Sequence, residues 1–329
     1  MKLKKLALLA GLVLSAALLM GSEVIAADYP SKDVMHIIPW SAGGGTDATM
    51  RTFMHHAEGK LGVKIFNKNI TGAQSGVGVF KLMKSPPDGY NIGTLTWDSV
   101  ITVPYYKLVP GYDIANLSFL CTVTLHSTAL VVHADFPWKT LADFIAAAKK
   151  SPGKYSISNV GTGGVWHLPA LDMASKVGIE VRHIPYPKGA APQREALLSG
   201  ETDAACMSIS AAFPAIKAKK ARVLAVMAEH REEGLSDVPT FKELGHDVVW
   251  GSFRMVAIPK DAPQDAKDKL EKAFSKVFAD PEFIKKSKET GMGAVWMDAK
   301  DTTAFIKTIQ TKAFALIDDL IEKGILKKK

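Results

Sequence analysis

Cysteine is scarce in this chain of 329 residues, which contains only Cys121 and Cys206. The two lie far apart and form no CxxC pair, so the sequence indicates neither a redox centre nor a cysteine-based zinc site. Both stand in apolar, strand-like stretches, which favours buried thiols. Spacing alone does not show whether their Cα atoms approach closely enough for a disulfide, so their pairing stays open.

Motifs of the common enzyme and nucleotide-binding classes are absent as well. The chain has no Walker A lysine, no G-x-G-x-x-G, no G-x-S-x-G, no H-E-x-x-H and no EF-hand loop. Its nine histidines do not fall into metal-ligand spacing, so we expect no metal and no cofactor. A serine or Cys206 could serve as a nucleophile, but the sequence places no base beside either.

Charge of one sign is not concentrated anywhere along the chain. The 41 lysines and arginines outnumber the 33 aspartates and glutamates, but they are scattered and mostly alternate with acids on predicted helices. Nucleic-acid binding needs a basic stripe with stacking aromatics or a reading helix, and neither occurs. The three lysines at 327–329 are interpreted as a solvated tail. A mildly positive exterior suits an anionic ligand, which it steers weakly.

Only one long hydrophobic run is present, and it lies at the start. Lys2, Lys4 and Lys5 precede the apolar residues 6–20, and a polar break leads to Val24-Ile25-Ala26. This pattern is typical of a secretory signal peptide, and the run is shorter than the roughly 20 residues of a membrane-spanning helix. We predict that residues 1–26 are removed by cleavage near Ala26 and that the mature protein is periplasmic.

Short apolar segments alternate with amphipathic ones through the remainder of the chain. Predicted strands at 35–38 and 90–95 enclose a helix whose apolar residues recur at i, i+3, i+4 and i+7. After residue 128 the same order begins again. Strands separated by helices predict parallel sheets with βαβ crossovers. We therefore predict an α/β clamshell of two lobes with two hinge crossings, each lobe a mostly parallel sheet flanked by helices.

The limits of the lobes follow from this repeat. Residues 27–127 and 247–329 are assigned to the first lobe, because two long amphipathic helices close the chain and return to it; residues 128–246 form the second. Separate strands are expected at 119–124 and 129–133, on either side of the first crossing. Ligands of such folds bind between the lobes, at the carboxyl ends of parallel strands.

Two glycine-rich loops stand at matching places in the two halves. They are Gly43-Gly44-Gly45-Thr46-Asp47 and Gly161-Thr162-Gly163-Gly164. Glycine lets backbone N–H groups turn into a cleft, and a helix N-terminus adds roughly half a positive charge. Together they can hold an anion without lysine or arginine. Two facing loops would grip both ends of a dicarboxylate, or one carboxylate and a polar tail.

Asp47 has two interpretations. Like Thr46, it can cap the helix that follows, because a carboxylate stabilises a helix start by itself. Close to an anionic ligand it would be repulsive. Capping and the ordering of water are therefore favoured over direct contact with the ligand.

Further candidates border the expected cleft. Trp40, Trp97 and Trp166 each lie beside a loop, where they either shape that loop or form an apolar wall for an aromatic or long-chain acid. Lys188 and Arg254 could make charge-assisted bonds to a carboxylate. A solvated surface position explains Lys188 equally well, whereas Arg254 lies inside an apolar strand.

A series of short segments along the whole mature chain has the order known from one protein family. The segments are Tyr29-Pro30-Ser31-Lys32, Ile37-Ile38-Pro39-Trp40-Ser41-Ala42-Gly43-Gly44-Gly45-Thr46-Asp47, Pro87-Asp88-Gly89-Tyr90, Gly161-Thr162-Gly163-Gly164 with His167-Leu168, Pro185-Tyr186 with Lys188-Gly189-Ala190-Ala191-Pro192, Gly200-Glu201-Thr202-Asp203, Asp237-Val238-Pro239-Thr240 and Ile258-Pro259-Lys260. This chain therefore resembles the Bug (TctC-like) solute-binding proteins, which serve tripartite tricarboxylate transporters.

The resemblance implies a two-lobed periplasmic binding protein fold. It implies a ligand carboxylate held by backbone amides of the two glycine loops, with ordered waters, and cleft walls formed by residues 96–98 and by Met207-Ser208. Two departures stand out. Trp97-Asp98 replace the usual small hydroxyl residues, so the pocket is reshaped. Met207 stands where some amino-acid binders of the family carry an acid, which disfavours an amino-acid ligand.

The candidate ligand-binding residues come from the loops, walls and charged positions just described. They are Trp40, Ala42, Gly43, Gly44, Gly45, Thr46, Asp47, Thr96, Trp97, Asp98, Gly161, Thr162, Gly163, Gly164, His167, Tyr186, Lys188, Met207, Ser208 and Arg254.

The function predicted from these features is capture of a small carboxylate (a di- or tricarboxylate, or an aromatic acid) by hinge closure. The expected partners are that ligand and the large and small membrane subunits of a tripartite transporter, with the binding protein itself a monomer. Alternatives are a binder of phosphonate or another oxyanion, and a secreted enzyme on the same fold. A regulatory domain would need a DNA-binding helix pair, and the signal peptide argues against it.

Overall fold

The computed structural model describes residues 28–232 and 234–326. The predicted signal peptide, its cleavage point and the lysine tail lie outside these ranges. Within them, no helix has the length and apolar character needed to cross a membrane.

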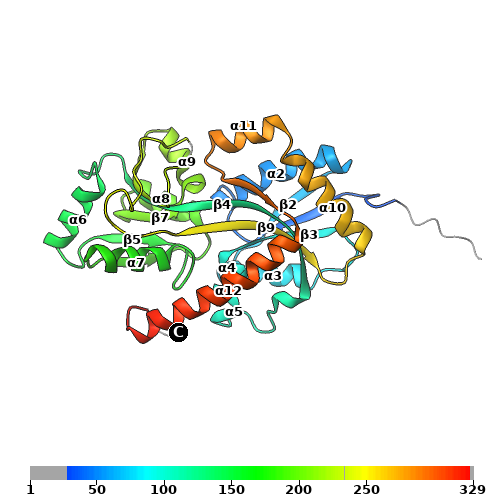
Figure 1. The fold of residues 1–329 in the computed structure, drawn as a ribbon, viewed down its shortest axis with the longest axis horizontal. Helices are drawn as coiled ribbons and strands as arrows, with labels where there is room; N and C mark the ends of the chain where they lie inside the picture. The colour runs from blue at the N-terminus through cyan, green and yellow to red at the C-terminus, as the bar shows by residue number, and fades with distance from the viewer. Residues whose placement is uncertain (1–27, 233, 327–329) are drawn as a thin grey trace, which may run out of the picture.

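Two lobes lie side by side along the long axis of the molecule, joined by two long strands (Figure 1). The strand order is β2-β1-β3-β9-β4-β7-β5-β6, with β10 and β8 also paired to β4. Pairing is parallel in β2-β1-β3 and in β7-β5-β6, and antiparallel where β9 and β4 join these groups. The predicted two-lobed α/β fold is confirmed.

The first lobe contains the N-terminal and C-terminal parts of the chain. Its elements are β1 (Val34–Ile38), α2 (Gly45–Leu61), β2 (Ile65–Asn69), α3 (Gly76–Met83), β3 (Asn91–Thr96), α4 (Trp97–Val100), α5 (Thr102–Tyr105), the 3-10 helix η1 (Ile114–Asn116), β9 (Gly251–Pro259), α10 (Gln264–Val277), α11 (Pro281–Glu289), β10 (Ala294–Met297) and α12 (Ala299–Glu322).

The second lobe is built from the middle of the chain. Its elements are α6 (Leu141–Lys150), β5 (Ser156–Asn159), α7 (His167–Val177), β6 (Arg182–Pro185), α8 (Ala190–Leu198), β7 (Ala204–Ser208), α9 (Ile209–Lys217) and β8 (Ala221–Met227). The predicted capping box is present at α6, where Thr140 and Asp143 each bond the other's backbone N–H. Cys121 and Cys206 are free, buried thiols.

The strand that joins the lobes, β4 (Leu117–His133), is continuous over 17 residues. The prediction of separate strands at 119–124 and 129–133 is therefore wrong. β4 pairs with β9 as far as Ser127 and with β7 and β8 from Thr128 onward. Because a partner strand is available on each side of this point, the polar residues between the two predicted strands stay in an extended ladder. The predicted lobe limits remain a proposal.

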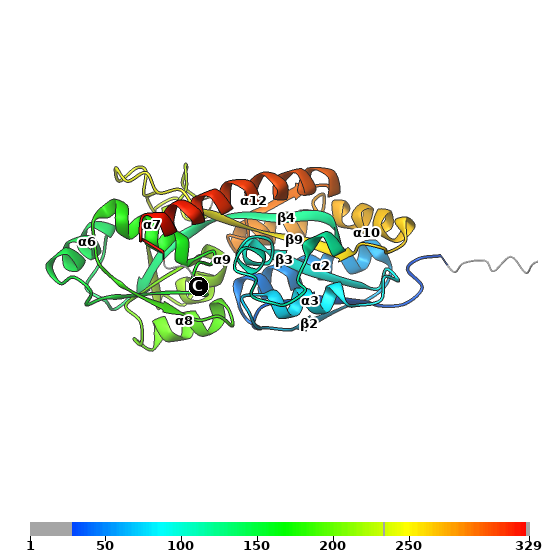
Figure 2. The ribbon, with the colours of Figure 1, turned by 90° about the horizontal axis from the view of Figure 1, so that it is seen from below.

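Helix α12 links the lobes a third time. It runs along β4 and β9, and its C-terminal end lies close to α7 in both views (Figures 1 and 2). Several of its apolar residues, including Ile306, Ile317 and Leu320, are buried in the largest core cluster. The hinge strands are therefore covered on this side by a helix that both lobes contact.

A second core cluster lies between α2, α10 and α11 in the first lobe. Its centre is Phe53, which is fully buried. Its ring centroid lies 5.4 Å from that of Phe274, 5.8 Å from Phe278 and 5.9 Å from Phe283. Aromatic pairs at such distances add to the free energy gained by burying the rings themselves.

Phe53→Ala is expected to lower the free energy of unfolding by about 3–5 kcal/mol, because it leaves a cavity that its three neighbours cannot fill. Urea unfolding of the mature protein measures the change. Phe66→Ala is the matched control, since Phe66 is 55% exposed, and a change below about 0.5 kcal/mol is expected there. Equal losses in the two variants would contradict this account of the core.

Candidate functional site

A small cavity lies between the lobes, at the carboxyl ends of the parallel strands of both. Its walls follow β1, β3, β5, β6 and β7, and its floor belongs to the hinge strands β4 and β9. The lining residues are Trp40, Gly44, Gly45, Thr46, Thr96, Asp98, His126, Val160, Val165, Trp166, Gly189, Ala190, Ser208, Ala211, Ser252, Phe253 and Arg254. Eight of the predicted ligand-binding residues are among them.

The first wall is the N-terminus of α2. Gly44 is its N-cap, in extended conformation and without a side-chain cap, so the prediction that Thr46 or Asp47 caps this helix is wrong. The glycines let the helix begin earlier, at Gly45. The first N–H groups of a helix have no acceptor within it. Gly45 and Thr46 therefore present amides and the positive end of the helix dipole to the cavity.

Asp47 is held away from any ligand by its own lobe. Its carboxylate accepts hydrogen bonds from the Gly43 N–H at 2.9 Å, from Arg51 Nε at 2.8 Å and from Asn69 Nδ2 at 2.8 Å. These three donors fix the loop before α2. The contacts match a role in organising the site.

Arg254 forms the floor of the cavity. Its side chain is only 2% exposed. The guanidinium donates to Thr46 Oγ1 at 3.2 Å in the first lobe and to Ser210 Oγ at 3.2 Å in the second. No carboxylate of the described residues pairs with it. Burial lowers the pKa of Arg254 to about 9, which still leaves the side chain protonated at neutral pH.

His126, on β4, lies beside Arg254 of β9 and is 7% exposed. Because a guanidinium can only donate, the 3.1 Å contact makes Nδ1 of His126 the acceptor of Arg254 Nη1. A neutral ring then carries its proton on Nε2, a buried atom with no partner among the described residues. Burial, and secondarily the charge of Arg254, hold the pKa of His126 well below 6.5. The cavity therefore offers an anion one cation and one further N–H donor.

Helix α9 forms the wall from the second lobe. Ser208 is its N-cap and accepts a hydrogen bond from the Ala211 N–H. The N-termini of α9 and α2 meet closely: a Cβ placed on Gly45 would lie 2.9 Å from Ala211 N. Two helix N-termini, one from each lobe, thus converge on the cavity. The partner of the first glycine loop is α9, and not the loop 161–164.

The loop 161–164 uses its amides elsewhere. The Gly161 N–H donates to Asn159 Oδ1 at 2.8 Å, and the Gly163 N–H donates to His167 Nδ1 at 2.9 Å. The Gly164 N–H donates to the Gly161 carbonyl at 3.0 Å. The loop shapes the interface between the lobes, while Val160, Val165 and Trp166 beside it reach the cavity.

The remaining predicted residues do not line this cavity. Ala42, Gly43 and Lys188 are exposed. Tyr186 donates from its hydroxyl to Glu201 at 2.7 Å, and Met207 packs in a core cluster of the second lobe. Thr162 is half-buried in the loop 161–164.

Trp97 lines a different cavity, on the opposite face of the hinge strands. The reason is local: the chain enters α4 at this residue, which turns the ring away from Asp98 and toward Phe253, at 6.2 Å between centroids. Of the three tryptophans considered as cleft walls, Trp40 and Trp166 reach the interlobe cavity.

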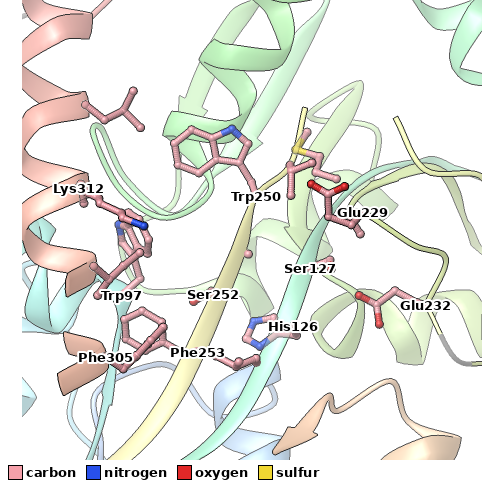
Figure 3. Close-up of a pocket in the computed structure, with 18 residues that line it drawn as sticks. Trp97, His126, Ser127, Glu229, Glu232, Trp250, Ser252, Phe253, Phe305 and Lys312 are labelled. Carbon is pink, nitrogen blue, oxygen red and sulfur yellow. The ribbon is translucent and has the colours of Figure 1, made fainter. Parts of the chain in front are cut away.

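The second cavity has a volume of about 530 Å³. Figure 3 shows Trp97, Phe305 and Lys312 on the side of α12, Glu229 and Glu232 on the other side, and the hinge strands between them. Both lobes and the hinge contribute to its walls. Its shape therefore depends on the angle between the lobes.

The interlobe cavity itself measures only about 30 Å³, room for about two water molecules and well below the roughly 300 Å³ of typical ligand sites. Arg194 Nη1 crosses between the lobes to the Gly43 carbonyl at 3.1 Å. The structure therefore shows closed lobes, and a ligand needs an opening of the hinge to enter.

Residues 49–321 match the family model described as "Tripartite tricarboxylate transporter family receptor". The chain belongs to this receptor family. Its members are periplasmic solute-binding proteins, so the predicted family is confirmed. A relative from Cupriavidus necator, the UPF0065 protein in gbd 5'region, is 30% identical over 305 residues, 92% of this chain and 91% of the relative.

Two further relatives place the chain within the tripartite tricarboxylate transporter receptor family. Protein BugT of Bordetella pertussis is 28% identical over 243 residues, 73% of this chain and 74% of BugT. The solved structure of periplasmic binding protein BugD superposes with a TM-score of 0.82 at 27% identity, over 91% of this chain and 99% of BugD. The fold described above is thus shared with a solved periplasmic binding protein.

Sequence reasoning missed several residues that line the cavity, among them His126, Ser252 and Phe253. A signal for Ser252 was available, because it lies two residues before Arg254 on a predicted strand and so faces the same side. His126 becomes its neighbour only through the pairing of β4 with β9, which places His126 opposite Ser252. Local patterns carry no information on that pairing.

The lowered pKa of His126 predicts a dependence of stability on pH. Between pH 6.5 and the lowered pKa of His126 in the folded protein, this histidine binds a proton in the unfolded chain but not in the folded protein. The contribution of His126 to the free energy of unfolding is therefore fully present above pH 6.5. The free energy of unfolding is expected to fall as the pH drops below 6.5. His36, whose pKa burial lowers to about 4, adds a contribution of the same sign.

His126→Asn should reduce this loss, because the amide oxygen can still accept from Arg254 and no longer titrates. Urea unfolding at pH 7.5 and pH 5 measures the difference, with His55→Asn as a control at a side chain that is 80% exposed. An unchanged loss in His126→Asn would show that His126 does not titrate as described.

Proposed function

We propose that this protein captures a small carboxylate in the interlobe cavity and delivers it to the membrane subunits of a tripartite transporter. The observation that carries the proposal is Arg254, a buried cation that contacts both lobes and has no acidic partner among the described residues. The family assignment supports the transport role. The ligand class is inferred from the site, and the transporter partner from the family.

A buried charge is costly unless it is paired and hydrogen-bonded. Arg254 donates hydrogen bonds to neutral groups only, at Thr46, Thr124, Ser210 and His126. A carboxylate would supply the missing negative charge and accept strong, charge-assisted hydrogen bonds from the guanidinium. The Nε2–H of His126 and the first amides of α2 would supply further donors to the same group. The site thus favours an anion on both charge and hydrogen bonding.

Closure of the hinge follows from the same contacts. Groups of the first lobe (Thr46) and of the second (Ser210) both bond Arg254, so a ligand on this side chain lies between the lobes. A ligand that touches both lobes binds the closed form more tightly than the open form and shifts the population toward it. We infer that the open form receives the ligand and that the closed, monomeric form docks on the transporter.

Thermal stability in the presence of candidate ligands tests the proposal most simply. Ligand that binds only the folded protein raises the unfolding midpoint. Aliphatic and aromatic carboxylates are expected to do so, and Arg254→Gln should weaken the affinity for the best of them by about 30-fold or more, since truncating a buried charge pair costs roughly 2–5 kcal/mol. Calorimetry gives the affinity.

Arg231→Gln is the matched control, because Arg231 pairs with Glu243 at the surface, and its affinity should equal that of the wild type. Stabilisation by phosphonates alone would favour the oxyanion alternative over the carboxylate. No stabilisation by any anion, or full affinity in Arg254→Gln, would contradict the proposal.

Gly45 offers a separate test of closure. A Cβ at this position would come within 3.1 Å of Ala211 N, Cβ and Cα across the lobe interface. Gly45→Ala should hold the lobes apart and weaken ligand affinity by roughly tenfold, in line with about 1–3 kcal/mol for overpacking. Small-angle scattering should show less compaction on ligand addition than in the wild type.

Gly59→Ala is the control in the same helix, since a Cβ there meets nothing within 4 Å. It should leave affinity unchanged and can only favour the helix. If both alanine variants bind like the wild type, contact between α2 and α9 is not part of the ligand-bound state.

A further inference from the structure

Asp98 is a carboxylate of the first lobe that is fully buried, with 0% exposure, and it lines the interlobe cavity. It lies in α4, directly after β3. Its Oδ1 accepts a hydrogen bond from the Thr102 hydroxyl at 2.7 Å within the first lobe. The same oxygen accepts the Val165 N–H of the second lobe at 3.2 Å. Asp98 therefore joins the two lobes through its carboxylate.

The fit of Asp98 against the second glycine loop is close. A Cβ on Gly164 would lie 2.7 Å from Asp98 Oδ1, so only glycine at this position lets the carboxylate reach the Val165 amide. Thr102 also reaches the loop, with its hydroxyl 3.4 Å from the Gly163 carbonyl. The amide beside this loop, which an anion could use, is thus occupied by a carboxylate of the protein itself.

The rest of the cavity has a polar part and an apolar part. Arg254, His126 and the first turn of α2 supply cationic and N–H groups. Val160, Val165 and Trp166 supply an apolar wall on the side of the second lobe. Among the described lining residues, Arg254 is the one cation and Asp98 the one carboxylate. A ligand therefore meets a cation, Arg254, at one part of the cavity and the carboxylate of Asp98 at another.

We propose that Asp98 acts as a specificity residue that restricts the site to monocarboxylates with an uncharged tail. This inference rests on the proposed function and names the ligand class within it. The ligand carboxylate pairs with Arg254, and the tail packs on Val160, Val165 and Trp166. A second carboxylate on the ligand would have to displace Asp98 from the Val165 amide or lie beside it. Two carboxylates that share a site repel each other, and the Val165 N–H can serve only one of them well.

Affinities for matched pairs of acids test this inference in the mature protein. The pairs are butyrate with succinate, hexanoate with adipate, and benzoate with terephthalate; each pair differs by one carboxylate. Calorimetry on the wild type is expected to show at least tenfold tighter binding of the monocarboxylate in the pair that binds best. This comparison needs no variant.

Two variants separate the effect of the Asp98 charge from the effect of its hydrogen bond with the Val165 N–H. Asp98→Asn keeps an oxygen that can accept from Val165 and removes the charge, and Asp98→Ala frees the amide. The preference for the monocarboxylate should shrink about tenfold or more in Asp98→Ala and less in Asp98→Asn. Asp88→Asn, at an exposed acid paired with Lys32, should leave the preference unchanged.

The outcomes distinguish this inference from the proposed function. If dicarboxylates bind the wild type as tightly as their monocarboxylate partners, or if both Asp98 variants keep the wild-type preference, the role of Asp98 is overturned while carboxylate binding stands. If no member of any pair binds, carboxylate capture is itself overturned, and the role of Asp98 with it. Should Asp98→Ala not fold, Asp98→Asn and the wild-type pairs still decide.

Discussion

Arg254 is a cation kept almost entirely out of water, and the energetics of keeping it there shape the rest of the site. Its neighbours are hydroxyl groups and a neutral histidine, which satisfy hydrogen bonds without compensating the charge. Beside it, α2 and α9 point their N-termini at the same space, and helix N-termini also favour negative charge. All of these groups become more stable when an anion occupies the cavity.

The hinge strands allow this arrangement to form and to open. β4 passes from one lobe to the other without a break, and β9 returns beside it. Side chains alternate across the two strands, so Arg254 faces the interlobe cavity while Phe253 packs on Phe305 toward the opposite face. His126 borders both cavities. One ribbon thus forms the floor of the interlobe cavity and a wall of the larger cavity behind it, and a change in hinge angle alters both.

Sequence patterns predicted the local features of the site. The glycine loop before α2, the tryptophan beside it and an arginine inside an apolar strand are each visible in a short window, and all three meet in the cavity. The sequence did not reveal the role of the loop 161–164. Asn159 and His167, which are close in the chain, accept the N–H groups of Gly161 and Gly163, and Asp98 of the other lobe accepts the N–H of Val165 beside the loop. The direction of the Trp97 side chain depends on the turn into α4. The placement of His126 depends on the pairing of β4 with β9, two strands more than a hundred residues apart in the sequence. Such contacts arise from the assembled fold and leave no periodic signal.

A crystal structure of the mature protein with its tightest-binding carboxylate would test the central claim most directly. We expect lobes closed around the ligand, with a cavity wider than the about 30 Å³ of this structure. The ligand carboxylate should lie within hydrogen-bond distance of Arg254 and of the first amides of α2. A ligand bound elsewhere, for example in the cavity beside α12, or a carboxylate in the cleft that leaves Arg254 unpaired, would contradict it.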